Sequence, residues 1–277
     1  MNFADIKQKY KINVFEWNTF YIFILGYSFW LTAIYLRLCY QYSYVYTFPL
    51  SILGVYTLFT PLHEATHNNI SSNKLINQRL GNIIIFPFFF SSFETFTYIH
   101  LQHHAHTNKD KDPDKFSRFG MISCICMPIH YYYYYFDSLI QRDLCIQNGY
   151  LNQNIVYIIF NWFIVCIGYM IGILNHIFIL WIIPSFIGIG LLSYIFDYLP
   201  HRYHEHIDIY THTKMTDGLL TLNNKKGNDI ISILTCNQLT YHHVHHLYTK
   251  IAFYRYKQFW EEHYDELKDK YTSQTII

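Results

Sequence analysis

Long apolar stretches with very few charges dominate the chain. Four of them are long enough to cross the roughly 30 Å apolar layer of a membrane as helices, which takes about 20 residues. They cover residues 17–36, 44–62, 155–174 and 177–199. Arg37 and Gln41 favour a tight turn between the first two, and Asn175-His176 is the polar break between the last two. The pattern predicts an all-α integral membrane protein with four transmembrane helices in two hairpins.

Two other apolar stretches, 83–93 and 121–140, are not predicted to cross the membrane. The first is too short, and the second contains His130 and the five consecutive tyrosines Tyr131–Tyr135. We expect both to lie at the membrane interface, with the tyrosines as interfacial anchors rather than an electron path. If either crossed the membrane, the histidine clusters on its two sides would face opposite leaflets.

The positive charges predict which side the polar segments occupy. With four spans, the N-terminus, residues 63–154 and residues 200–277 share one side and hold every Lys and Arg except Arg37. By the positive-inside rule that side is the cytoplasm. It also holds every histidine except His176. We therefore expect one domain over residues 1–277, a multi-pass membrane protein with a cytoplasmic helical cap that carries the histidines, and no cleavable signal peptide.

Composition narrows the function classes. The 28 Tyr and 23 Phe suit a chain that meets membrane interfaces. A net charge of +1 gives no field for nucleic acid, and the six cysteines lack the paired spacing of a disulfide framework or a zinc knuckle. The outlier is histidine, with 17 copies.

Most of these histidines fall into three clusters at helical spacing. They are His63-Glu-Ala-Thr-His67, the segment 100–106, and the segment 242–246; the last two share the pattern HxxHH. Residues spaced i, i+3 and i+4 lie on one helix face. With one more histidine at the end of the fourth span, the candidate ligands are His63, His67, His100, His103, His104, His201, His242, His245 and His246. One zinc takes four ligands, so nine imidazoles suit two metals with open positions, and iron is the metal if the task is O₂ activation.

Other polar residues receive supporting or ordinary roles. Candidates to orient the ligands or hold a bound water are Glu64, His106, Asp197, His204, His206 and His243. We expect the isolated His130, His176, His212 and His263 to be ordinary hydrogen-bonded residues. Asp110, Asp112 and Asp114 read as a solvated acidic turn around Pro113.

Three alternatives fit less of the pattern. Residues 63–67 satisfy HExxH, the pattern of an intramembrane zinc protease, but a protease needs only one further ligand. A carboxylate-bridged di-iron bundle needs Glu-x-x-His on two helices, and only Glu64 and His67 fit. A metal transporter would place ionisable ligands inside the spans, which are nearly free of them.

At this point the chain resembles the membrane fatty-acid desaturase superfamily, over roughly residues 55–260. The strings that carry the likeness are HLQHHAHTNKDKDPD (100–114), YLPHR (198–202) and YHHVHHLYTKIAFYRY (241–256). Within the superfamily they look most like β-carotene hydroxylases and ketolases. The chain departs from the related pattern at Thr249 and Ala252, where proline is usual, and at Asp197, where acyl desaturases commonly have Asn.

The resemblance implies a non-haem di-iron oxidoreductase that uses two Fe²⁺ ions and O₂. It makes all nine candidate histidines iron ligands and favours a carotenoid ring as substrate, with a fatty acyl chain as the alternative. The chain has no fused redox domain, so a separate ferredoxin or cytochrome-type donor must supply electrons. Basic residues that could receive an acidic donor are Lys225, Lys226, Lys250, Arg255 and Lys257.

Overall fold

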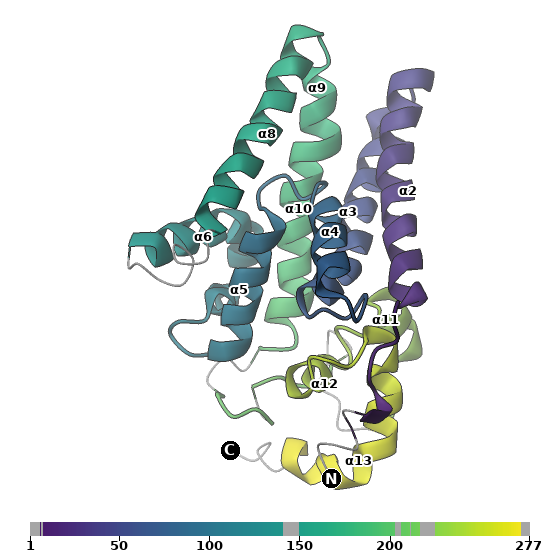
Figure 1. Cartoon of the computed structure of the whole chain (residues 1–277), viewed down its shortest axis with the longest axis vertical. Coiled ribbons are helices and arrows are strands. Elements are labelled where there is room, and N and C mark those ends of the chain that lie inside the picture. Colours follow the sequence, from purple (N-terminus) through teal and green to yellow (C-terminus); the bar gives the residue numbers. More distant parts are fainter. Residues whose placement is uncertain are drawn as a thin grey trace.

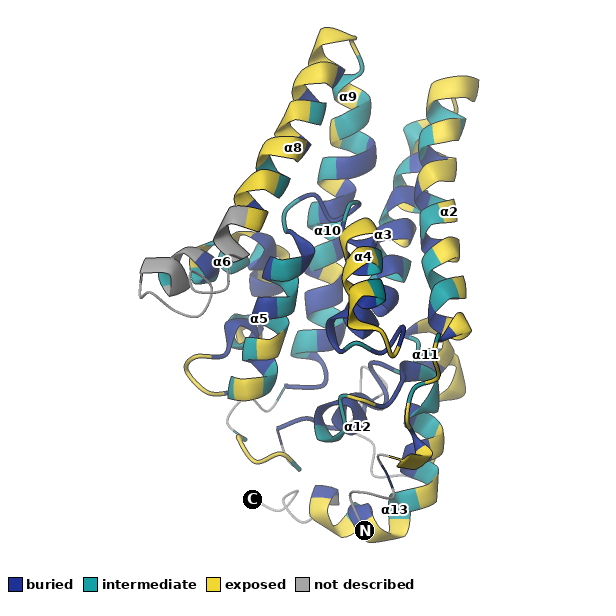
Figure 2. Ribbon diagram, in the orientation of Figure 1, coloured by how far each residue is buried: buried dark blue, intermediate teal, exposed yellow. Residues whose placement is uncertain are grey.

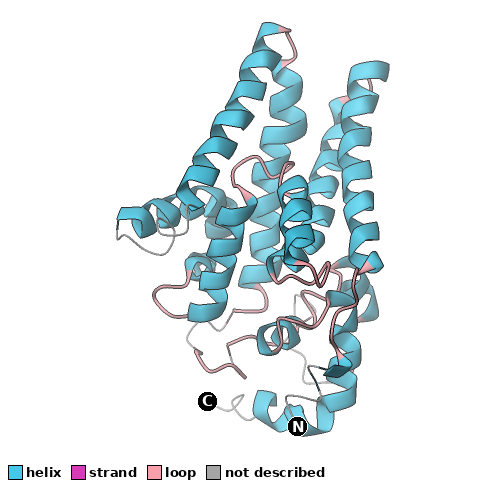
Figure 3. Ribbon diagram, in the orientation of Figure 1, coloured by secondary structure: helices cyan, strands magenta, loops and turns pink. Residues whose placement is uncertain are grey.

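The structure, a computed structural model, describes residues 6, 8–140, 150–202, 206–210, 212–216 and 225–272. This described part is helical and has no strand beyond one isolated bridge between Phe15 and Ser71 (Figure 3). Four helices are long and apolar enough to cross a membrane. They are α2 (Trp17–Tyr40), α3 (Tyr44–Thr66), most of α8 (Tyr150–Met170), and the continuous segment Leu174–Tyr198. The all-α class and the four apolar helices are confirmed.

The turns at the far ends of these helices differ in how well they were predicted. The first lies at Gln41, whose φ of 56° is left-handed, and Arg37 donates to the carbonyls of Gln41 and Tyr42. The second is centred on Gly172, with φ of 79°. The predicted break at Asn175-His176 is wrong, because both residues lie inside the helix α9 (Leu174–Ile177). The chain turns at Gly172 instead, since glycine adopts a positive φ without strain. The Tyr44 hydroxyl, on α3, hydrogen-bonds the His176 ring there.

The fourth apolar segment is not a uniform α-helix. It runs through α9, the π-helical η2 (Phe178–Ile182), α10 (Ile183–Leu192) and the π-helical η3 (Ser193–Tyr198). π-Helical turns often accompany functional sites because they change which side chains face inward. Here η3 carries Asp197 immediately before the polar end of the segment.

Small residues let the long helices approach closely. A Cβ added to Gly54 of α3 would lie 2.8 Å from the Cβ of Trp30 in α2, and one added to Gly188 of α10 would lie 2.6 Å from Val55. Such contacts hold membrane helices together where burial from water cannot. The outer faces of α2 and α8 instead expose large apolar side chains (Figure 2). With the family described below, these helices identify an integral membrane protein.

The remaining elements gather at one end of the four long helices. Figure 1 shows α11 (Asp229–Leu234), α12 (His242–Leu247) and α13 (Tyr256–Thr272) beyond that end, with α4 (Lys74–Ile84) and α5 (Phe93–His106) alongside the long helices. A second hydrophobic core, formed around Tyr241, Val244, Tyr256 and Phe259, joins α12 to α13. This core holds α12 in place on the side that packs against α13.

The two stretches expected at the interface pack against protein. Phe86 and Phe89, in the turns after α4, contact the rings of Trp30 and Trp181, which accounts for their apolar character. Residues 121–140 form the helix α6 (Met121–Ile140), which contacts α10. Of its tyrosines, Tyr133 is exposed but Tyr135 is fully buried. The tyrosine run is therefore not only an interfacial anchor.

Candidate metal centre

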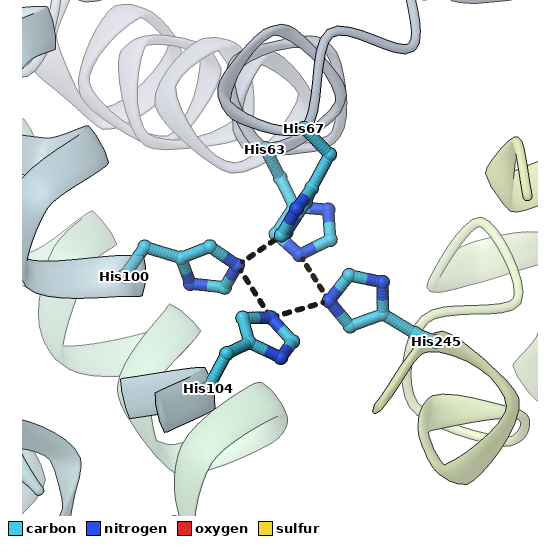
Figure 4. Close-up of side chains that lie close together, drawn as sticks. All are labelled: His63, His67, His100, His104 and His245. Carbon is cyan, nitrogen blue, oxygen red and sulfur yellow. Dashed lines mark hydrogen bonds between the residues drawn. The ribbon is translucent and has the colours of Figure 1, made fainter. Parts of the chain in front are cut away.

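Five histidines from three helices point their Nε2 atoms at one another (Figure 4). The Nε2–Nε2 distances are 3.0 Å from His63 to His245, 2.8 Å from His67 to His100, 3.0 Å from His100 to His104 and 2.9 Å from His104 to His245. α3 supplies His63 and is capped at its C-terminus by His67, α5 supplies the pair at 100 and 104, and α12 supplies His245. We call this set the first histidine group.

A second histidine group lies beside the first. It consists of His103, His201, His242 and His246, and the ligand atoms within each group lie within 4.8 Å of one another. The Nε2–Nε2 distances are 3.3 Å from His103 to His246, 3.2 Å from His201 to His242 and 3.1 Å from His242 to His246. The two groups together contain all nine candidate ligands.

Helix periodicity explains how each HxxHH pattern serves both groups. On α5, His100 and His104 are one turn apart and face the first group, while His103 is rotated toward the second. On α12 the second group takes His242 and His246, and His245 faces the first. The groups consequently touch, with the His104 and His246 ring centroids 4.4 Å apart.

The outward-facing nitrogens fix which ring nitrogen carries the proton. The Nδ1 of His201 lies 3.0 Å from the His212 carbonyl, and the Nδ1 of His242 lies 3.0 Å from the Gln238 carbonyl. A carbonyl only accepts, so both Nδ1 atoms carry a proton and both neutral rings keep a bare lone pair on Nε2. These two lone pairs face each other at 3.2 Å, which is repulsive unless a cation lies between them.

The spacing of the nitrogens fits a metal ion. Two nitrogens bound at about 2.1 Å and at angles between square and tetrahedral are about 3.0–3.4 Å apart. Burial, followed by the neighbouring imidazoles, lowers the pKa well below its usual value for His67, His100, His104, His242, His245 and His246. These rings are neutral, as metal-binding imidazoles must be. The donor set therefore fits two metal ions, one in each group.

The predicted solvated acidic turn is wrong for two of its three carboxylates. Asp110 is exposed, but Asp112 and Asp114 are buried, and their oxygens lie 2.9 Å and 3.3 Å from Nδ1 of His103. η1 (Pro113–Phe119) turns these side chains inward, with Asp112 as its N-cap. Burial opposes charge on His103, but the two carboxylates outweigh it and raise the His103 pKa to about 9.

Glu64 supports the first group without facing the metal position. Its Oε2 accepts from the Phe253 amide at 3.3 Å, and its Oε1 accepts from the Tyr256 hydroxyl at 3.5 Å. That hydroxyl also lies 3.0 Å from Nδ1 of His245. Glu64 thus orients Tyr256, and Tyr256 orients a ligand.

A narrow apolar cavity of about 80 Å³ leads to both groups. His63 and His100 line it together with aromatic rings, of which Phe96 stacks on His100 at 5.9 Å. Its polar corner is Tyr131, whose hydroxyl lies 2.9 Å from Oδ1 of Asp114 and 3.3 Å from Oδ2 of Asp197. Asp197, expected near the metals, lines this cavity, and Tyr131 was missed because a tyrosine run resembles an interfacial anchor.

The other expected supporting residues lie elsewhere. His106 lines a separate open pocket with Gln102 and Lys115, and His243 packs between the rings of Trp260 and Tyr271 on the far side of α12. The His206 carbonyl accepts from Asn108 at 2.7 Å. His204 lies outside the described residues.

One isolated histidine lies closer to the centre than expected. The ring centroid of His212 is 4.9 Å from that of His246. Its position was not predicted because it lies outside the three histidine clusters, six residues beyond His206. The threonines that flank it, at 211 and 213, do not specify a ligand.

Comparison with known proteins agrees with this geometry. The model of the fatty acid desaturase family matches residues 40–276, which include every member of both histidine groups. Searches of curated proteins and of solved structures found no match to the chain. Because the family match covers most of the sequence, the chain belongs to the fatty acid desaturase family.

Proposed function

We propose that the protein is an O₂-dependent di-iron oxidoreductase that oxidises a C–H bond of an apolar membrane lipid. The family implies oxidoreductase activity and is typically di-iron. The observation that carries the proposal is the pair of adjacent histidine groups, whose Nε2 atoms converge at the end of an apolar cavity. We further propose that the four long helices cross the membrane as two hairpins, with both groups in a cap on the cytoplasmic side.

The protein's own residues would hold the metals and shape the reaction space. Two bound iron ions would supply O₂ activation, chemistry that zinc lacks. Nδ1 of His103 donates a hydrogen bond to Asp112, so a metal would replace only the proton on Nε2. Phe59 and Phe196 stack at 4.9 Å beside the groups and exclude water from the cavity.

The lining of the cavity supports an apolar substrate. Its walls are mostly aromatic and aliphatic side chains, and its volume is about 80 Å³. A carotenoid ring is the first candidate, because the strings at 100–114 and 241–256 favour it. A straight fatty acyl chain is the alternative, and it is the slimmer of the two.

Both reaction outcomes require a separate electron donor. Hydroxylation and desaturation each reduce O₂ fully, taking two electrons from the substrate and two from outside. The basic residues proposed to receive an acidic ferredoxin or cytochrome-type donor are Lys225, Lys226, Lys250, Arg255 and Lys257. Lys250 donates to the His67 carbonyl, next to the first group, whereas Lys257 already pairs with Asp229 at 2.6 Å.

The test combines metal analysis with product profiling. Cells expressing the protein are supplied with β-carotene or fatty acids, and lipids are analysed by mass for added oxygen or lost hydrogen. We expect about two irons per chain and a new alcohol or alkene. A single zinc with proteolytic activity would support the HExxH alternative and refute the proposal.

A cavity variant supplies the structural control. Ser193→Leu replaces a small side chain in the buried cavity wall with a larger one, which narrows the cavity. It should lower the amount of product by at least 10-fold while leaving bound iron unchanged. Leu191→Phe changes an exposed neighbour on the outer face and should behave as wild type. Equal product from the Ser193 variant would show that substrate does not use this cavity.

A further inference from the structure

The two histidine groups are unequal. The first contains five imidazoles and the second only four, although the second is the more completely buried and has the closer carboxylates, Asp112 and Asp114. The rings that surround His246 show which other described residue could complete the second group. Besides members of the two histidine groups, one more imidazole of the described residues lies among them, that of His212.

The position of His212 matches that of a ligand. Its ring centroid lies 4.9 Å from His246, compared with 4.9 Å for His201 and 5.0 Å for His103 to the same ring. It is 6.3 Å from the His201 ring. The side chain is 7% exposed, and its Nε2 has no hydrogen-bond partner among the described residues. A buried ring nitrogen without a partner destabilises the fold unless something binds it.

The backbone of His212 is tied to the same centre. Its carbonyl accepts from Nδ1 of His201 at 3.0 Å and from the Asn108 side chain at 3.1 Å, and its amide donates to the Asp208 carbonyl at 2.8 Å. The segment is therefore held against the second group by contacts that do not involve the imidazole. With the backbone held in this position, the His212 ring stays next to the second group, and its Nε2 is available to a metal bound there.

We propose that His212 is a tenth imidazole of the centre, binding the metal of the second histidine group through Nε2. The inference rests on the proposed metal centre and adds a residue to it. His212 is not among the four residues whose ligand atoms already lie within 4.8 Å of one another, so its side chain would have to move to bind a metal held by those four. Each group would then offer five imidazoles.

The test uses Co²⁺ as the probe, because cobalt binds imidazole sites and reports its coordination through visible absorption. Purified metal-free protein in detergent is titrated with Co²⁺, and the two binding steps are measured for wild type and His212→Gln. This variant keeps the backbone carbonyl that His201 needs. We expect two Co²⁺ per chain in wild type, and in the variant one step weakened by 10–100-fold with a changed spectrum for that ion alone.

A matched control and a rescue separate binding from packing. His130→Gln removes a half-buried imidazole that hydrogen-bonds the Pro113 carbonyl at 3.0 Å outside both groups, and should titrate as wild type. In His212→Gly, added free imidazole should restore the second Co²⁺ step and its spectrum. Unchanged steps in His212→Gln, or a Gly variant that imidazole does not rescue, would overturn the inference.

The result is distinguishable from failure of the proposed function. A wild-type protein that binds two Co²⁺ but yields no oxidised lipid with iron and a donor refutes the oxidoreductase proposal and leaves His212 as a ligand. A wild-type enzyme that forms product while His212→Gln binds both ions normally refutes only the role of His212.

Discussion

At the scale of single residues, the outward nitrogen of each ligand matters as much as the inward one. Asp112 accepts from Nδ1 of His103 at 2.9 Å, from the Asn108 amide at 2.6 Å and from the Asp114 amide at 2.9 Å. One buried carboxylate thus sets the tautomer of a ligand and shapes the loop that carries it. Partners of this kind tune metal affinity strongly although they do not touch the metal.

We predict that Asp112→Asn weakens metal binding at the second group by about 10–100-fold. The amide has the same shape but one fewer acceptor and no charge to favour the His103 Nδ1 proton. Bound iron is measured after equilibration with a chelator. Asp110→Asn, two residues away, changes an exposed carboxylate paired with Lys115 and serves as control. Equal iron retention in both variants would show that Asp112 does not orient His103.

At the scale of elements, helix contacts decide where the ligands stand. α3 carries His63 and His67 at its polar end, and its position depends on close approach to α2 at Gly54. α5 and α12 each divide their histidines between the two groups, so a rotation of either helix would disturb both groups. Packing far from the centre is thereby linked to its geometry.

We predict that Gly54→Val destabilises the protein by about 1–3 kcal/mol, because overpacking a tight contact forces the helices apart. The new Cβ would meet the Trp30 backbone nitrogen at 2.9 Å, and backbone cannot swing aside as a side-chain tip can. Leu53→Val, on the 42% exposed neighbouring position, is the control. Unfolding is followed in detergent micelles, and identical midpoints for the two variants would contradict the predicted role of the contact.

At the scale of the whole molecule, the centre joins parts of the chain that are far apart in sequence. α3, α5, α12 and His201, which follows η3, meet there, and the facing lone pairs of His201 and His242 repel each other. Bound metal would convert that repulsion into attraction. Metal binding and assembly of the cap are therefore coupled.

We predict that chelation lowers the thermal midpoint and exposes the segment 225–272 to protease. At a free metal concentration 100 times Kd, binding contributes about 2.7 kcal/mol per site, and chelation removes this contribution. Adding Fe²⁺ back anaerobically should restore both properties. An unchanged midpoint and cleavage pattern in the metal-free protein would show that the groups are stable without metal.

The sequence by itself determined the features that depend on local periodicity. Apolar runs define membrane-spanning helices because one helix of about 20 residues crosses the apolar layer without help from the rest of the chain. Histidines at i, i+3 and i+4 share a helix face for the same local reason, so the nine candidate ligands could be named in advance.

Only the tertiary structure decided how those residues are divided and what surrounds them. The split of each HxxHH pattern between two groups depends on where α5 and α12 meet. The contacts of Asp112 with His103, of Tyr131 with Asp197 and of His212 with His246 join residues whose spacing has no helical period. The turn at Gly172 replaced the expected polar break because backbone conformation outweighed side-chain polarity there. Contacts between distant segments arise from packing of the whole chain, and no local pattern encodes them.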